Sequence, residues 1–187
     1  MWFRKNKSIR KEVSMGILYV VATPIGNLLD ITRRSIEILN KVDIILCEDT
    51  RNSSHLLNSL GIKTKLISYH KFNETSRSKE VIDLLKNGMN IAIITDAGTP
   101  CISDPGSILV HEAIKNDIDV YSIPGPSAVI TSLTLTGLTI NNFAFYGFLD
   151  RKNTKQIEKL KEISKNDVEI IVLYESPKRI LNTLNNI

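Results

Sequence analysis

The sequence predicts an α/β fold: a mostly parallel, doubly wound sheet in the N-terminal part, followed by a second, incomplete α/β domain. Short apolar runs rich in Val and Ile recur along the chain, at 17–22, 43–47, 65–69, 91–95 and 119–123. Such runs are typical of strands that are buried on both faces of a parallel sheet. Segments with helical periodicity separate them, and this alternation favours a doubly wound domain.

The helices between these strands are predicted from apolar positions that share one face. The first has such a face, formed by Ile31, Ser35, Ile38, Leu39 and Val42. We expect Asp30 to cap its start, because a carboxylate can accept the unpaired N–H groups there. A later helix carries Val81, Ile82 and Leu85, with Gly88 as its stop. A third contains Ala113 and Ile114, and Pro105 is expected at its first position, after Asp104.

A basic segment, residues 1–14, precedes the first apolar run and gives the N-terminus a likeness to a signal peptide. The apolar run is short, stops at Pro24 and has no convincing small-residue cleavage site after it. We therefore interpret it as the first buried strand. The predicted organisation is a basic extension (1–14), an N-terminal α/β domain (15–123) and a C-terminal α/β domain (124–187).

The C-terminal domain is predicted to begin at Pro124-Gly125-Pro126 with a helix at 127–136. A strand at 143–147, a polar helix at 152–164 and a strand at 169–174 follow. A last helix carries an apolar stripe formed by Ile180, Leu181, Leu184 and Ile187. Because the sequence ends inside this helix, we expect the domain to be incomplete.

The composition is that of an ordinary soluble protein, with 42% hydrophobic and 24% charged residues and a net charge of +4. The mild basic excess is compatible with a polyanionic partner but does not require one. Two cysteines and three histidines show no metal-binding or redox spacing, so we expect no metal site and a reduced, cytosolic setting. No segment has the roughly 20 apolar residues that a membrane helix needs.

Loops rich in Gly and Pro follow most of the predicted strands. In an open α/β sheet, ligands bind at the carboxyl ends of the strands. A single loop of this kind is usually only a turn, but several on one sheet edge favour a rigid, narrow cleft. The G-x-G-x-x-G and G-x-x-x-x-G-K-[ST] fingerprints are both missing, which argues against common NAD and ATP sites. The residues alone indicate a small-molecule cleft without naming its ligand.

Six motifs in collinear order resemble the bacterial 16S ribosomal RNA (cytidine-2′-O)-methyltransferase I family, within the tetrapyrrole methylase superfamily. They are Tyr19–Leu28, Glu48–Arg51, Asp96–Pro100, Pro124–Ala128, Tyr146–Leu149 and Tyr174–Arg179. The resemblance covers about residues 15–187. The family continues for roughly another hundred residues, so the chain looks truncated at its C-terminus.

The resemblance implies that S-adenosylmethionine binds in a cleft between the two domains and that the chain acts as a homodimer. The superfamily's Gly-Asp-Pro loop corresponds to Gly98-Thr99-Pro100, with Thr99 in place of the acid. The cofactor-binding residues so implied are Pro24, Gly26, Asp96, Gly98, Thr99, Pro100, Pro124, Gly125 and Ser127. The implied substrate is cytidine 1402 of 16S rRNA in the small ribosomal subunit.

Methyl transfer to a ribose hydroxyl is helped by a nearby base, and Glu175 is the first choice among the carboxylates of the cleft loops. The alternative is that Glu175 caps the last helix or pairs with Arg179. Arg51, Lys152, Lys178 and Arg179 are the expected RNA-binding residues. Arg51 has an alternative as well, a bridge to Glu48 or Asp49.

Two other functions stay open at this point. One keeps the fold and changes the substrate to a small molecule such as a tetrapyrrole, although Pro24–Asn27 and Glu48–Arg51 resemble the RNA-modifying branch. The other is a truncated remnant without activity, which the end of the sequence at Ile187 supports.

Overall fold

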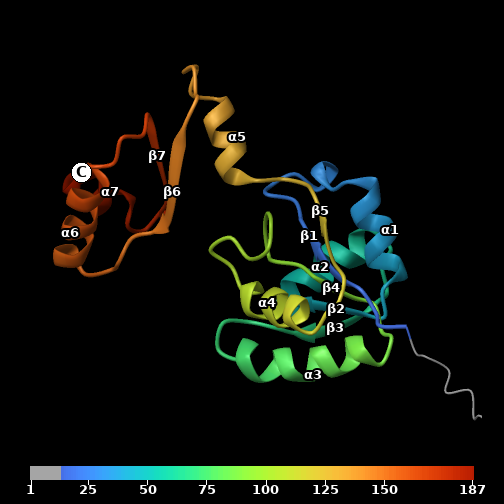
Figure 1. Cartoon of the computed structure of the whole chain (residues 1–187). Coiled ribbons are helices and arrows are strands. Elements are labelled where there is room, and N and C mark those ends of the chain that lie inside the picture. The colour runs from blue at the N-terminus through green and yellow to red at the C-terminus, as the bar shows by residue number, and fades with distance from the viewer. Residues whose placement is uncertain (1–13) are drawn as a thin grey trace, which may run out of the picture.

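The computed structural model describes residues 14–187 and contains a five-stranded parallel sheet (Figure 1). Its strands are β1 (Leu18–Val21), β2 (Ile44–Cys47), β3 (Lys65–Ser68), β4 (Ile91–Ile93) and β5 (Val120–Ile123). They lie in the order β3-β2-β4-β1-β5. All five predicted strands are confirmed. The predicted basic extension lies, apart from Ser14, outside the described residues.

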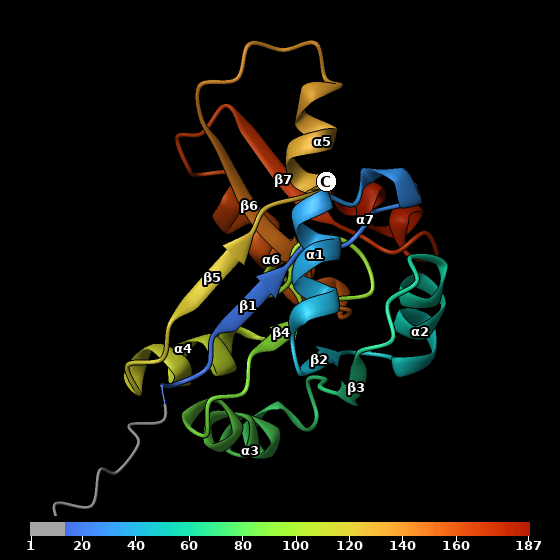
Figure 2. The ribbon, with the colours of Figure 1, turned by 90° about the vertical axis from the view of Figure 1, so that its right-hand side faces the viewer.

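Helices cover both faces of this sheet, as a doubly wound fold requires (Figure 2). Helices α3 (Glu74–Lys86) and α4 (Ser107–Lys115) pack on one face, and α1 (Arg33–Lys41) and α2 (Thr50–Ser59) pack on the other. Side chains from the central strands alternate between the two cores: Leu46 faces α3 and α4, whereas Ile45 faces α1 and α2, and both are fully buried. The chain therefore buries its strands on both faces.

Two helix starts differ from the sequence prediction, and one helix was missed. Asp30 ends a short 3-10 turn, η1 (Leu28–Asp30), and the cap of α1 is Thr32, whose Oγ1 accepts the N–H of Ser35 at 3.0 Å. The expectation for Pro105 is also wrong, because α4 begins at Ser107. Helix α2 was not predicted, since its sequence offers few apolar positions and buries only Ser53 and Leu57.

Replacing Thr32 with alanine is expected to lower the free energy of unfolding by about 1 kcal/mol, the usual cost of losing an N-cap. The hydroxyl also lies 2.8 Å from that of the buried Ser35, which would lose this partner. Urea denaturation measures the change. Thr75→Ala is the matched control, because Thr75 is exposed in the first turn of α3 and caps nothing. Equal stabilities for the two variants would contradict the assignment.

A second, smaller unit follows β5. Helix α5 (Ala128–Thr134) leads to β6 (Phe143–Phe148), α6 (Asn153–Ile163), β7 (Ile170–Tyr174) and α7 (Ile180–Asn186). Strands β6 and β7 pair in parallel, with α6 as the crossover between them (Figure 1). These elements confirm the predicted order, while the predicted boundary at Pro124 between two domains stays a prediction.

Helix α7 packs its polar side, and not its apolar stripe, against α6. Its buried residue is Thr183, whereas Leu181 and Ile187 are each about three-quarters exposed. The Asn182 side chain donates to Asn153 Oδ1 at 2.9 Å. Within residues 14–187, no helix is long and apolar enough to cross a membrane.

Candidate active site

Three loops begin side by side at the carboxyl edge of the sheet, after β4, β1 and β5. Strand β1 lies between the other two, so the loop that contains Pro24 and Gly26 has a neighbour on each side. The Thr23 N–H donates to Gly98 O at 2.9 Å and the Gly98 N–H donates to Thr23 O at 3.1 Å. The Thr23 hydroxyl, fully buried, donates to Thr95 O at 3.0 Å. The first two loops are thus joined through their backbones.

The third loop is attached to the other two by small residues. The Thr99 hydroxyl donates to Pro126 O at 3.1 Å. Gly125 lies close to the carboxyl end of β1, and a Cβ atom on Gly125 would stand 2.9 Å from Ala22 Cβ. Gly98 itself has a φ of +88°, a conformation that residues with side chains rarely adopt. The small residues at these positions allow the three loops to pack closely.

A cleft of about 370 Å³ opens between these loops and the second unit. Its size is in the range of small-molecule sites. Three of the predicted cofactor residues, Gly98, Thr99 and Ser127, line it. The complete lining is Ile25, Ala97, Gly98, Thr99, Ile102, Ser103, Asp104, Ser127, Ala128, Phe148, Tyr174 and Glu175.

The other predicted cofactor residues lie around the cleft. Gly125 lines an adjoining hollow together with Ser127. Asp96 faces a different pocket, beside Glu48 and Asp49, and accepts a hydrogen bond from Asn52 at 3.1 Å. Pro24, Gly26, Pro100 and Pro124 belong to the three loops but are not among the residues that line the cleft.

The wall contributed by the second unit is aromatic. The rings of Phe148 and Tyr174 lie 5.5 Å apart, and the ring of Phe145 packs edge-on to Tyr174 at 4.8 Å. Residues three apart on a regular strand point to opposite faces, but a register shift between Phe145 and Phe148 brings both rings to Tyr174. Phe148 stays 55% exposed at the cleft.

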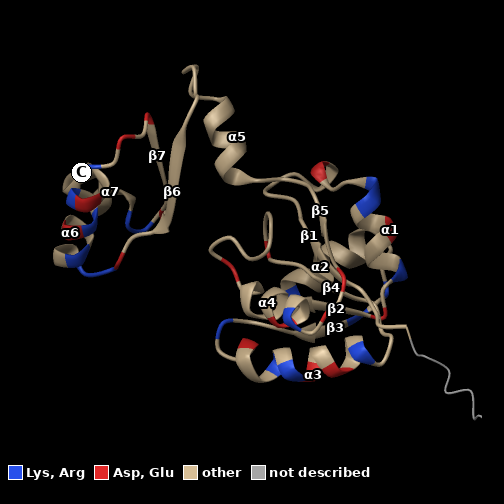
Figure 3. Cartoon of the chain, in the orientation of Figure 1, with Lys and Arg blue, Asp and Glu red and all other residues tan. Residues whose placement is uncertain are grey.

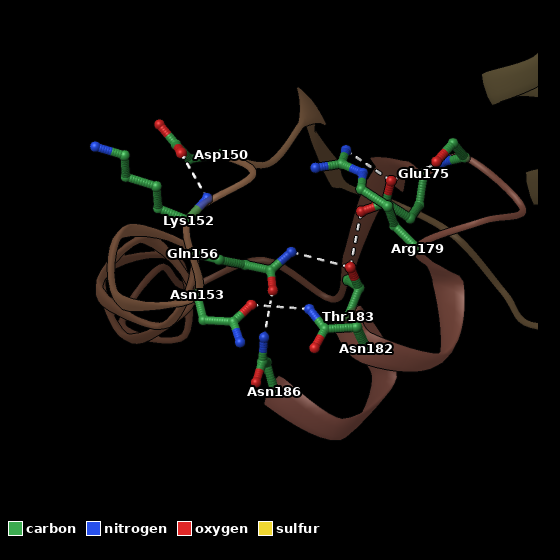
Figure 4. Close-up of polar contacts among 10 residues, drawn as sticks. Asp150, Lys152, Asn153, Gln156, Glu175, Arg179, Asn182, Thr183 and Asn186 are labelled. Atoms are coloured by element: carbon green, nitrogen blue, oxygen red, sulfur yellow. Dashed lines mark hydrogen bonds and ion pairs between the residues drawn. The ribbon is translucent and has the colours of Figure 1, made fainter.

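Glu175 lies at the carboxyl end of β7 with its side chain only 5% exposed. One carboxylate oxygen accepts from Arg179 at 2.7 Å and from the Ser176 N–H at 2.6 Å. The other accepts from the Thr183 hydroxyl at 2.7 Å (Figure 4). Of the two structural alternatives, the pairing with Arg179 is confirmed, whereas α7 has no side-chain cap.

This arrangement extends into a polar network between α6 and α7. The Gln156 side chain donates to Thr183 Oγ1 at 2.9 Å, and Gln156 in turn accepts from Asn186 (Figure 4). Burial raises the pKa of Glu175, but hydrogen bonds from Thr183, Ser176 and Arg179, together with the Arg179 charge, outweigh it and leave the pKa lowered. The carboxylate is therefore stable as an anion, and the prediction that it is the general base stays a prediction.

The loops after β4 and β2 place carboxylates near the cleft, away from the Glu175 network. Burial raises the pKa of Asp104, and the charge of Asp96 adds to this effect, although a hydrogen bond from Thr95 opposes it. Burial likewise raises the pKa of Glu48, with contributions from Asp104 and Asp96. Asp96 and Asp104 belong to the loop after β4 and Glu48 to the loop after β2, and the fold places these two loops together.

The expected RNA-binding residues differ in their surroundings. Arg51 bridges Asp49 at 2.9 Å, as its alternative predicted, and hydrogen bonds from Arg51 lower the pKa of Asp49 to about 2. Arg179 is held by Glu175. Lys152 and Lys178 are exposed and make no ion pair within residues 14–187. Figure 3 shows acidic and basic residues interleaved along α3 and α6.

Several lining residues were not predicted as site residues, among them Ser103, Asp104, Phe148 and Tyr174. The runs that contain them stood out in the sequence, but nothing in a loop sequence states which side chains turn inward. Phe148 reaches the cleft only because of the irregularity in β6. Ser103 lies there with a φ of 63°, unusual for a residue with a side chain.

A doubly wound α/β fold with a small-molecule cleft at the carboxyl ends of its strands defines a broad class of ligand-binding proteins, and comparison with known families identifies the family within it. The chain belongs to the tetrapyrrole (corrin/porphyrin) methylase family, whose model matches residues 17–187. Within it, the chain is similar to proteins named ribosomal RNA small subunit methyltransferase I. It is 47% identical to that of Thermotoga maritima over 174 residues, covering 92% of this chain and 77% of the relative. It is 46% identical to that of Synechocystis sp., covering 92% of this chain and 62% of the relative.

The chain spans about three-fifths of the length of most of these relatives, including 63% of the protein from Halalkalibacterium halodurans. Among solved structures, diphthine synthase is similar with a TM-score of 0.65 at 17% identity, covering 86% of this chain and 65% of that one. Uroporphyrin-III-C-methyltransferase from Thermus thermophilus has a TM-score of 0.61 at 16% identity, covering 91% and 70%. These two likenesses support the fold.

Proposed function

We propose that the protein transfers the methyl group of S-adenosylmethionine to the 2′-hydroxyl of a cytidine in 16S rRNA of the small ribosomal subunit. The observation that carries the proposal is the identity of 42–47% to ribosomal RNA small subunit methyltransferases I, over 92–97% of this chain. Cytidine 1402 is the proposed target nucleotide, as the sequence resemblance implies.

The residues of the cleft fit S-adenosylmethionine. Apolar side chains such as Ile25 and Ile102 offer surfaces for a nucleoside, and the Thr99 and Ser127 hydroxyls offer hydrogen bonds. The carboxylates of Asp104 and Glu175 also line this site. When bound, the cofactor supplies a methyl group that is already activated for displacement.

The protein's main contribution is then to position the two reactants. An in-line displacement needs the acceptor oxygen about 3–3.5 Å from the methyl carbon, opposite the sulfur. The joined loops at Gly98-Thr99 and Ser127 would fix the cofactor on one side. The aromatic wall of Phe148 and Tyr174 would face the acceptor nucleotide, whose base can stack on such rings. The carboxylate of Glu175 keeps the β7 loop in place through Arg179 and Thr183.

The RNA partner is proposed to contact Lys152 and Lys178, with Arg51 and Arg179 as further candidates. Lys152 stands at the start of α6 with its side chain directed away from the Glu175 network (Figure 4). The small ribosomal subunit is cytoplasmic, so the proposed reaction takes place there. A homodimer is the proposed assembly, on the resemblance alone.

The test is transfer of labelled methyl groups from S-adenosylmethionine to small ribosomal subunits that lack the modification. We expect label in the 16S RNA as an alkali-resistant 2′-O-methyl nucleotide. We also expect the apparent affinity for subunits to fall steeply as salt rises, because phosphate contacts release counterions. Methylation of uroporphyrinogen III with none of the RNA would contradict the proposal and favour the tetrapyrrole alternative.

A further inference from the structure

Two carboxylates line the cleft within residues 14–187, and they differ in how they are engaged. Glu175 pairs with Arg179, and its two oxygens also accept hydrogen bonds from Ser176 and Thr183. Asp104 makes no ion pair in the described part of the chain. A carboxylate without a cationic partner can accept a proton from a bound substrate more readily than one that a guanidinium holds.

Asp104 is held in the cleft by a strained loop between β4 and α4. Cys101 and Ser103 both have positive φ values, 73° and 63°, and such residues cost of order 1–3 kcal/mol each. The Cys101 N–H donates to Pro105 O at 3.3 Å and closes the loop. Ser103 lies against the β6 irregularity, since a Cβ on Gly147 would be 2.9 Å from its hydroxyl. Strain of this kind is typical of residues that a fold positions for function.

The surroundings of Asp104 favour its protonated form more than water does. Three carboxylates face Asp104: Asp96 from the loop after β4, Glu48 from the loop after β2, and Glu74 from α3. Tyr174 lies across the cleft from Asp104. The nearby cation is Lys71. Burial, together with the charge of Asp96, raises the pKa of Asp104 despite the hydrogen bond from Thr95. A raised pKa brings a carboxylate closer to the working range of a general base.

We propose that Asp104 is the group that accepts the proton of the acceptor hydroxyl, a role that rests on the proposed function. The hydroxyl oxygen forms a bond to the methyl carbon while the carbon–sulfur bond breaks, with its electron pair remaining on sulfur. The hydroxyl proton passes to the Asp104 carboxylate and later to water. Asp104 lines the same cleft as Phe148 and Tyr174, the rings proposed to face the acceptor nucleotide.

The test compares Asp104→Asn with Glu175→Gln in single-turnover methylation of small subunits from pH 5 to 9. We expect Asp104→Asn to lower the rate about 100-fold, a usual effect for a general base, and to abolish the fall in rate at low pH. Glu175→Gln should keep that fall at the same pH. Asp117→Asn, a matched change in the loop after α4 and away from the cleft, should behave as wild type.

Calorimetry with S-adenosylmethionine gives a readout that does not depend on turnover. We expect Asp104→Asn to bind it within about threefold of wild type. A loss of tenfold or more would overturn the proposal, because Asp104 would then be holding the cofactor's positive groups. A low-pH fall that disappears in Glu175→Gln and persists in Asp104→Asn would overturn it as well, in favour of Glu175. Wild-type protein that methylates no subunits would instead remove the proposed function itself.

Discussion

Replacing Gly98 with valine is expected to lower kcat/KM for methyl transfer about 100-fold. The φ of +88° at this position costs a residue with a side chain about 1–2 kcal/mol or more, and valine is branched at Cβ. The backbone cannot relax without breaking the two hydrogen bonds that join Gly98 to Thr23. The loop must therefore shift, and with it the contact of Thr99 to Pro126. A displacement of about 1 Å in a positioning element is enough for a loss of this size.

Gly61→Val is the matched control for backbone strain. Gly61 has a φ of +71° and nothing within 4 Å of the position of a Cβ, and it lies after α2, outside the cleft. We expect the two variants to lose similar stability in thermal melts, while only Gly98→Val loses activity by two orders of magnitude. Comparable activity losses would show that global strain, and not the cleft, is responsible.

Replacing Glu175 with alanine is expected to lower the free energy of unfolding by about 3 kcal/mol. The change leaves a largely buried guanidinium and the buried Thr183 hydroxyl without their partner, and removing one member of such a pair costs this much. Urea denaturation measures it. Glu158→Ala, an exposed carboxylate on α6, is the control and should change stability by less than about 0.5 kcal/mol.

The stabilisation by Glu175 should also depend on pH. Its pKa is lower in the folded protein than the ordinary value of about 4.3, so the stabilisation is fully present above that value. It is lost as the pH falls through the lowered pKa. We therefore expect the stability difference between wild type and Glu175→Ala to be constant from pH 7 to 5 and to shrink below pH 4. A difference that grows on acidification would contradict the ion pair.

The sequence predicted the parallel sheet because each strand is a short apolar run that is buried on both faces. Leu46 and its neighbour Ile45 point to opposite faces of the sheet and are both apolar, and such a continuous apolar run is visible in the sequence. Helix α2 was not predictable in the same way, since Thr50–Ser59 has few apolar positions and begins inside a run interpreted as a loop. The cap of α1 was misassigned because Asp30 and Thr32 are both good caps, and only the backbone conformation chooses between them.

The cleft could be predicted as a set of loops but not as a set of side chains. Gly98, Thr99 and Ser127 were identified from resemblance and do line it. The partner of Glu175 was predictable as an alternative, because Arg179 follows it at helical spacing. The inward position of Asp104 depends on two unusual φ angles, at Cys101 and Ser103, which no local propensity predicts. The position of Phe148 at the cleft depends on the register shift in β6.

A crystal structure with S-adenosylhomocysteine tests the central claim most directly. The ligand should occupy the cleft between the two units, in contact with the Gly98-Thr99 loop and with Ser127, and its sulfur should face the wall of Phe148 and Tyr174. Ligand density in the neighbouring pocket of Glu48, Asp49 and Asp96, or elsewhere on the surface, would contradict the assignment of this cleft as the methyl-transfer site.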